Sequence, residues 1–122
     1  MKIVAPLISL VAFAALSGCT AHDYVNDHKW AIEAPTEVVK GTEFPFKVTL
    51  VDANDKAIEG VDYRYQIHWP GGTVQPLRHV ASTGEDQKRR ASLVPGTATL
   101  VVTCENKEGA LVKVAEASLE IK

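Results

Sequence analysis

The sequence feature that most constrains the fold is a period-two alternation of apolar and polar residues, which runs through residues 29–34, 43–50, 61–69 and 97–104. In residues 43–50 the apolar members are Phe44, Phe46, Val48 and Leu50. Successive side chains of a β-strand point to opposite faces, so this alternation predicts strands with one buried face. Beyond the N-terminal segment no stretch keeps a helical period, which favours an all-β fold.

Turn-forming residues separate these segments. They gather at Lys40 and Gly41 and in residues 52–56, 70–72, 95–96 and 105–109. Asn, Asp, Gly and Pro favour turns because they adopt or preset the backbone angles that turns need. Short strands at near-regular spacing, divided by such turns, predict a single β-sandwich of about seven strands over residues 29–122.

Four local features refine this prediction. Residues 81–87 show no apolar period and are expected to form a mobile loop. The apolar residues change parity near Ala115 and Glu116, which predicts a β-bulge or a break in the last strand. Pro45 has no backbone N–H, so we expect it at a sheet edge or at an outward position that needs no donor. The basic residues 88–90 are expected at the start of a strand, on a solvated face.

The N-terminal segment has the organisation of an export signal. Lys2 precedes a nearly continuous apolar run over residues 3–16, which is shorter than the roughly 20 residues that a spanning helix needs. The next residues complete the motif Leu16, Ser17, Gly18 and Cys19. This motif resembles the lipobox of bacterial lipoproteins. The resemblance implies that residues 1–18 are a helical signal peptide that is cleaved, and that the thiol of Cys19 carries diacylglycerol.

Acylation at Cys19 would place the protein in the cell envelope. Each buried CH2 of an acyl chain contributes about 0.8 kcal/mol, so several chains hold a protein stably on membrane lipid. Residues 19–28 are polar and predict a lipidated tether to the domain at 29–122. Thr20 stands where an Asp resembles an inner-membrane retention signal, which favours the outer membrane in a Gram-negative host. The domain is then expected in the periplasm or at the cell surface.

A second resemblance concerns the folded domain. It rests on the stretches VKGTEF at residues 39–44, VTLVDANDK at 48–56, Gly60 with Val61, and PGTATL at 95–100. These resemble bacterial immunoglobulin-like domains of the invasin and adhesin kind, over residues 37–104. The resemblance implies an immunoglobulin-like β-sandwich. The chain departs from the family at Asn54 and Asp55, where the family usually carries Gly.

Charge and cysteine content limit the partners and the chemistry. The chain has 13 basic and 15 acidic residues, a balance that gives no electrostatic reason to bind nucleic acid. Once Cys19 is acylated, only Cys104 remains, so no internal disulfide is expected. Cys104 shares the parity of Leu100 and Val102, which predicts a buried thiol that acts as a small apolar residue. With no Gly-x-Ser-x-Gly motif and no paired carboxylates, we expect no enzymatic activity and no cofactor.

Metal binding is the alternative function. The layout is also similar to small periplasmic domains of the YtkA-like type, some of which are linked to copper through Met and His. The one Met of this sequence is residue 1, so the chain that would remain after cleavage at residue 18 has no Met. The candidate ligands are His22, Asp23, Asp27, His28, His68 and His79. None has the close spacing of a firm metal site, so we expect tether residues and surface histidines.

Ligand binding through an aromatic residue is the other candidate. Trp69 precedes the turn at 70–72 and lies near His68 and Arg64 in the sequence, and such a residue can stack on sugars or peptides. The alternative is that Trp69 belongs to a core stripe with Tyr63 and Tyr65, whose parity it shares. The sequence thus favours a membrane-anchored, non-catalytic binding module for an envelope protein or glycan partner.

The lipid anchor predicts the effect of one substitution. The wild-type protein is expected to stay in the membrane fraction after a high-salt wash, whereas Cys19→Ser is expected in the soluble fraction, because serine offers no thiol for acylation. Immunoblotting of the two fractions measures the result, with Thr20→Ser as the matched control that stays on the membrane. Retention of the Cys19→Ser protein would contradict the anchor.

Overall fold

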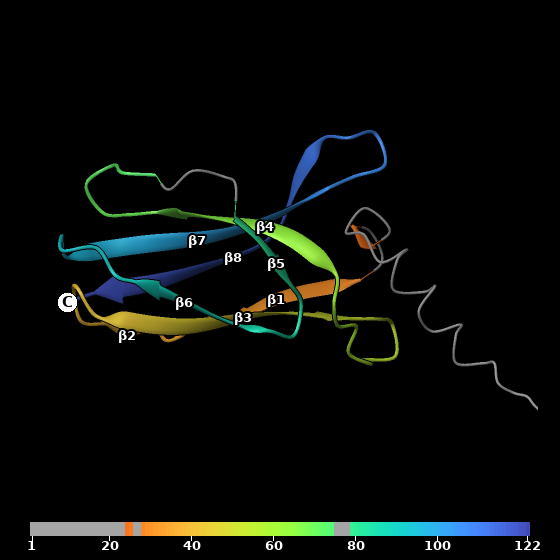
Figure 1. Cartoon of the computed structure of the whole chain (residues 1–122), viewed down its shortest axis with the longest axis horizontal. Coiled ribbons are helices and arrows are strands. Elements are labelled where there is room, and N and C mark those ends of the chain that lie inside the picture. Colours follow the sequence, from red (N-terminus) through yellow and green to blue (C-terminus); the bar gives the residue numbers. More distant parts are fainter. Residues whose placement is uncertain (1–23, 26–27, 75–78) are drawn as a thin grey trace, which may run out of the picture.

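The computed structural model describes residues 24–25, 28–74 and 79–122, without the side chains of residues 79 and 80. The predicted signal peptide, Cys19, His22, Asp23 and Asp27 lie outside the described residues. The described chain forms eight strands (Figure 1), which are β1 (Lys29–Glu33), β2 (Glu37–Val38), β3 (Glu43–Val51), β4 (Asp62–His68), β5 (His79–Ser82), β6 (Asp86–Arg90), β7 (Gly96–Glu105) and β8 (Leu111–Ile121).

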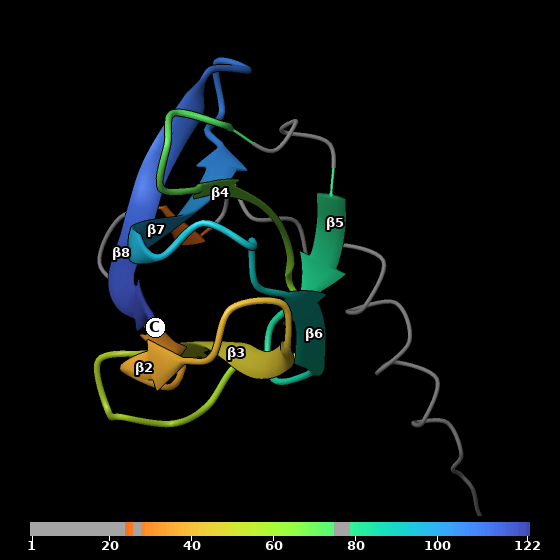
Figure 2. The ribbon, with the colours of Figure 1, turned by 90° about the vertical axis from the view of Figure 1, so that its left-hand side faces the viewer.

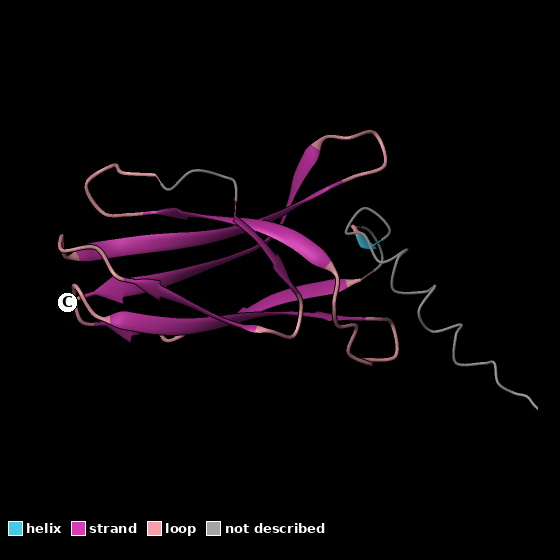
Figure 3. Ribbon diagram, viewed as in Figure 1, coloured by secondary structure: helices cyan, strands magenta, loops and turns pink. Residues whose placement is uncertain are grey.

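The strands form two facing sheets (Figure 3). One has the order β1-β3-β6 and the other has the order β2-β8-β7-β4-β5. The pairing of β2 with β8 is parallel and the remaining strand pairs are antiparallel. The chain thus begins with β1 in the three-stranded sheet, forms β2 at the edge of the five-stranded sheet, and returns to the first sheet with β3. This arrangement of strands is that of an immunoglobulin-like sandwich. The predicted fold class is confirmed, with eight strands in place of about seven.

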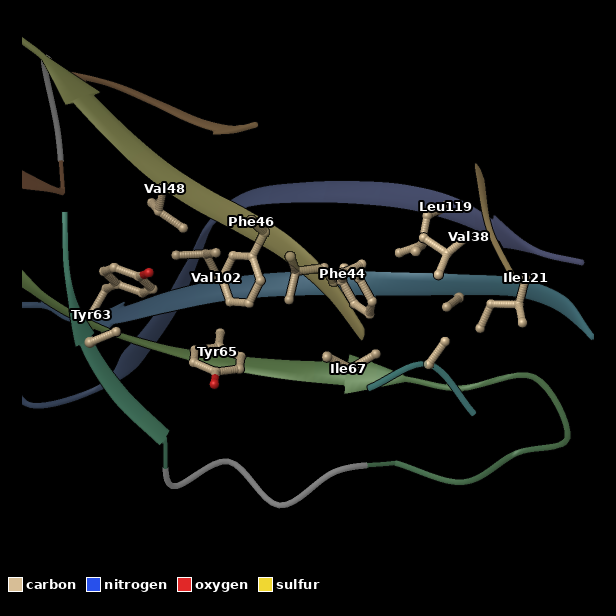
Figure 4. Close-up of a cluster of buried hydrophobic side chains, with 14 residues drawn as sticks. Val38, Phe44, Phe46, Val48, Tyr63, Tyr65, Ile67, Val102, Leu119 and Ile121 are labelled. Carbon is tan, nitrogen blue, oxygen red and sulfur yellow. The ribbon is translucent and has the colours of Figure 1, made fainter. Parts of the chain in front are cut away.

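The core lies between the sheets, where the predicted alternation places it (Figure 4). Its largest fully buried side chains include Phe46 and Leu50 of β3, Tyr63, Tyr65 and Ile67 of β4, Leu100 of β7, and Leu119 and Ile121 of β8. The rings of Phe46 and Tyr65 meet edge to face across the sandwich, with their centroids 5.0 Å apart. Full burial of an aliphatic or Phe side chain contributes about 1.5–3 kcal/mol, so this layer is the main source of stability.

A second, smaller cluster closes one end of the sandwich. Leu50, Val61 and Cys104 are buried there, and half-buried apolar residues pack against them, namely Tyr24, Val25, Trp30, Ile58 and Val114. Tyr24 and Val25 lie within the predicted tether at 19–28, and in the structure both pack against the domain. Their apolar side chains lower the free energy by leaving water, which a polar spacer cannot do.

The segment 81–87 is not the mobile loop that the sequence predicted. β5 and β6 occupy most of it and leave a turn at 83–85, where Thr83 is only 1% exposed. The Thr83 hydroxyl accepts a hydrogen bond from Val61 N at 3.1 Å and donates one to Ile58 O at 2.9 Å. β6 has polar or charged residues on both faces, so it carries no apolar alternation that would reveal a strand.

The basic residues 88–90 end a strand, contrary to the expectation that they begin one. Lys88 and Arg90 are exposed, but Arg89 points into the sandwich, with its guanidinium carbon 5.2 Å from the centroid of the Tyr65 ring. The face of the Tyr65 ring attracts the Arg89 guanidinium through a cation–π contact, so this charged group can lie at the edge of the core.

The predicted irregularities of β3 and β8 are both present. Pro45 is exposed on the outer face of β3. The last residue pair of β1 and β3 is Glu33 with Lys47, so Pro45 lies beyond the end of β1 and has no partner residue in that strand. The register of β7 and β8 shifts at Val114, because Val102 pairs with Ala115 and Thr103 pairs with Lys113. This bulge lies one residue before the predicted position.

The buried Thr83 hydroxyl predicts a large effect of a small substitution. Thr83→Val keeps the shape of the side chain but leaves Val61 N–H and Ile58 C=O without this partner, and we expect a loss of about 3 kcal/mol in the free energy of unfolding. Urea denaturation measures it. The exposed Thr36→Val is the control, with a change below about 0.5 kcal/mol. Equal effects of the two variants would show that the hydroxyl does not hold the turn.

Candidate functional site

The two ends of the sandwich differ in chemistry. We call the end formed by loops 39–42, 69–74 and 91–95 the tip, which lies at the left of Figure 1 and faces the viewer in Figure 2. We call the opposite end, with residues 52–60, 83–85 and 105–110, the base. The tip loops carry one charged residue, Lys40, whereas the base carries six acidic residues and two lysines. The tip is therefore the apolar end.

Hydrogen bonds fix two of the three tip loops, 39–42 and 91–95, to each other. Gly41 N donates to Ser92 O at 3.2 Å, and Arg90 Nη1 donates to Gly41 O at 2.7 Å. Lys40 N donates to the backbone oxygen of Lys122 at 3.0 Å, which ties the same loop to the end of β8. The β2–β3 and β6–β7 loops are far apart in sequence, but these bonds make them one rigid unit.

Two glycines allow the loops to approach closely. Gly41 has a φ of 74°, and a Cβ at this position would lie 3.0 Å from Cδ2 of Leu93. Gly96 has a φ of 139°, and a Cβ there would lie 3.0 Å from Cβ of Pro70. L-residues avoid such angles, and a side chain would push the loops apart. These contacts also show that Leu93 lies against the β2–β3 loop.

The fixed loops hold aliphatic side chains in solvent. Leu93 is 76% exposed, Val39 is 60% exposed and Val94 is 50% exposed. Leu93 lies against Gly41, and Val39 is in the same turn as Gly41, which Thr42 N closes by donating to Val39 O at 3.1 Å. Clustered exposed apolar residues on a soluble surface mark an interaction site more often than scattered ones do. We call Val39, Leu93 and Val94 the tip patch.

The sequence prediction missed the tip patch. Leu93 and Val94 lie outside the alternating segments, directly before the Pro95 turn, so they have no strand periodicity to mark them as core. An apolar pair inside a turn is the signal that was available. The sequence could not show that Leu93 lies against Gly41, which is in the same turn as Val39 and more than fifty residues away.

The predicted ligand residues do not form one site. Arg64 and His68 are exposed on the outer face of β4, whereas Trp69 is half-buried and packs against the core. The Trp69 ring meets Phe44 edge to face, with a centroid distance of 6.5 Å. Trp69 N also donates to Thr73 O at 2.8 Å, and this hydrogen bond closes the tip turn at 69–73.

Of the predicted metal ligands, the structure describes His28, His68 and the backbone of His79. The backbone register places His79 of β5 opposite Tyr65, three residues before His68 along β4. Within the part of the chain that the structure describes, no three side chains of His, Cys, Asp or Glu gather as a metal site would require.

A hollow of about 380 Å³ lies on the three-stranded sheet, where β1 ends beside β3. The hollow is lined by Pro35, Pro45 and a row of three charged residues. In this row the backbone register places Glu33 of β1 beside Lys47 of β3, and Lys47 beside Asp86 of β6. Lys47 Nζ lies 3.8 Å from Asp86 Oδ1. Lys47 offsets one of the two carboxylates of this row, and exposed ion pairs of this kind contribute about 0–1 kcal/mol. The hollow therefore presents a weaker case for binding than the tip.

Comparison with known proteins adds a likeness at the level of the fold. No known protein family matches the sequence, and no curated protein matches it either. The structure is similar to the crystal structure of the CARDB domain of the PF1109 protein from Pyrococcus furiosus, which is in complex with di-metal ions. The two share 16% identity and a TM-score of 0.49, over 79% of this chain and 88% of that domain. In the described residues, no helix combines the length and hydrophobicity needed to cross a membrane.

Cys104 is buried as predicted, and its surroundings predict its reactivity. Burial raises the pKa of the thiol to about 11, so thiolate is scarce at pH 8. In the Cys19→Ser protein, where Cys104 is the remaining thiol, we expect modification by a thiol reagent to be at least about 100-fold slower in buffer than in urea. Absorbance of the released chromophore measures the rate. Comparable rates in the two solvents would contradict the burial of this thiol.

Proposed function

We propose that this protein is a lipid-anchored, non-catalytic binding module of the cell envelope, and that it binds a protein partner through the tip patch. The observation that carries the proposal is the exposure of Leu93, Val39 and Val94 on loops that hydrogen bonds hold in place. A rigid apolar surface binds without the entropy cost of ordering loops, so each contact contributes more to affinity. Anchoring at Cys19 rests on the lipobox resemblance.

The chemistry of the tip favours a protein over a glycan. Sugars are bound by stacking on exposed aromatic rings, but the Trp69 ring is packed edge to face against Phe44. The exposed residues of the tip patch are aliphatic, as in the apolar centre of a protein interface. Lys40 and Arg90 lie at its margin and are exposed, so they would pair with acidic groups around an apolar site on the partner.

Photo-crosslinking in intact cells tests the proposal. A photoreactive residue in place of Ser92 at the tip is expected to yield a discrete adduct with a protein, whereas the same residue in place of Lys107 at the base yields none. Adding Leu93→Asp is expected to reduce the adduct at least about tenfold, since it buries a carboxylate in an apolar contact. Quantitative immunoblotting measures both.

The control is the stability of the Leu93→Asp protein. Leu93 is 76% exposed, so the substitution is expected to change the free energy of unfolding by less than about 0.5 kcal/mol. Loss of the adduct then reflects the contact and not the fold. An adduct that survives Leu93→Asp, or that forms equally from position 107, would show that the tip patch is not the binding surface.

A further inference from the structure

We infer that Tyr24 and Val25 mount the sandwich on the bilayer with the base toward the lipid and the tip patch away from it. The inference rests on the proposed function, because it takes Cys19 as the acylated residue. It adds the orientation of the domain and identifies the base as the surface that faces the lipid headgroups.

The contacts of Tyr24 and Val25 show where the N-terminal segment joins the domain. Both side chains are half-buried and pack on the cluster of Leu50, Val61 and Cys104 at the base. The indole Nε1 of Trp30 donates a hydrogen bond to Tyr24 O at 2.9 Å. Tyr24 also meets His28 edge to face, with centroids 5.0 Å apart. These contacts fix the junction, so it cannot act as a free swivel.

Chain length then limits where the domain can lie. Four residues, 20–23, separate Cys19 from Tyr24, and this stretch spans at most about 18 Å between the two Cα atoms. β7 has ten residues and runs from Gly96 at the tip to Glu105 at the base, a length of about 33 Å. The connection is thus about half as long as the domain. A domain held at its base by so short a connection keeps the base closer to the bilayer than the tip.

Charge decides how the base meets the lipid. Its loops carry Asp52, Asp55, Glu59, Glu85, Glu105 and Glu108 against Lys56 and Lys107. Anionic headgroups repel such a surface within a Debye length of about 8 Å at physiological salt. The base therefore stands off the headgroups within the reach of the connection, and it does not embed in them. The tip patch is left free for a protein partner.

Energy transfer to labelled lipid tests the orientation on the intact acylated chain. A donor dye is attached to Lys107→Cys at the base or to Ser92→Cys at the tip, since Cys104 is buried and Cys19 is acylated. The vesicles contain phosphatidylethanolamine and phosphatidylglycerol with a headgroup acceptor. We expect clearly more transfer from position 107 than from position 92. Twelve added Gly and Ser residues between positions 20 and 21 are expected to reduce the transfer from position 107.

Tyr24→Ser combined with Val25→Ser is expected to make the transfer from the two positions nearly equal, because it frees the junction. The wild-type comparison of base and tip needs no destabilised variant, so the inference stays testable if this double variant unfolds. Equal transfer, or more transfer from the tip, on vesicles that carry the protein would overturn the mount and leave the anchor standing. Failure of the acylated chain to bind vesicles would overturn the anchor and the mount together.

Discussion

The structure depends on one apolar layer that two sheets close from both sides. The layer is built from alternate residues of β3, β4, β7 and β8, and the contact of Phe46 with Tyr65 lies near its middle. No disulfide joins the described strands, and the buried Cys104 is free. Immunoglobulin domains of antibodies reinforce the same layer with a disulfide between sheets. Here the packing of this layer and a few hydrogen bonds of the loops hold the sheets together, so the exclusion of water at both ends of the layer is decisive.

The two ends exclude water by different means. At the base, Tyr24, Val25 and Trp30 cover Leu50 and Val61, and the Thr83 hydroxyl satisfies two backbone groups of the neighbouring loop. At the tip, Trp69 covers the core beside Phe44, and backbone hydrogen bonds join the loops above it. At the tip, water is thus excluded from the core without the outermost aliphatic residues. These residues are free for binding, which is why the tip patch and not the hollow of the three-stranded sheet carries the proposed function.

Not every interior polar group is satisfied. The Tyr63 hydroxyl is buried and makes no hydrogen bond within the described structure, and burial raises the pKa of the phenol. Its ring fills the core between β3 and β4, and the apolar gain exceeds the loss of the hydrogen bond that the hydroxyl makes to water. Asp55 lies in an exposed turn and adopts a φ of 62°, in the left-handed region that favours Gly. Asp tolerates this angle, so the turn forms without Gly.

The sequence alone determined the strands with one buried face, because period-two alternation in Phe44–Leu50 or Ala98–Cys104 has only one structural solution. It also indicated the buried thiol, the outward Pro45 and the bulge in β8. It could not reveal β6, whose faces are both polar, or the packing of Tyr24 and Val25, which lie outside any periodic segment. Only the tertiary structure brought Leu93 against Gly41 in the turn that carries Val39, and turned Trp69 toward the core. Strand periodicity is a local property that neighbouring residues specify, whereas a surface made of two loops depends on hydrogen bonds between segments that are distant in the chain.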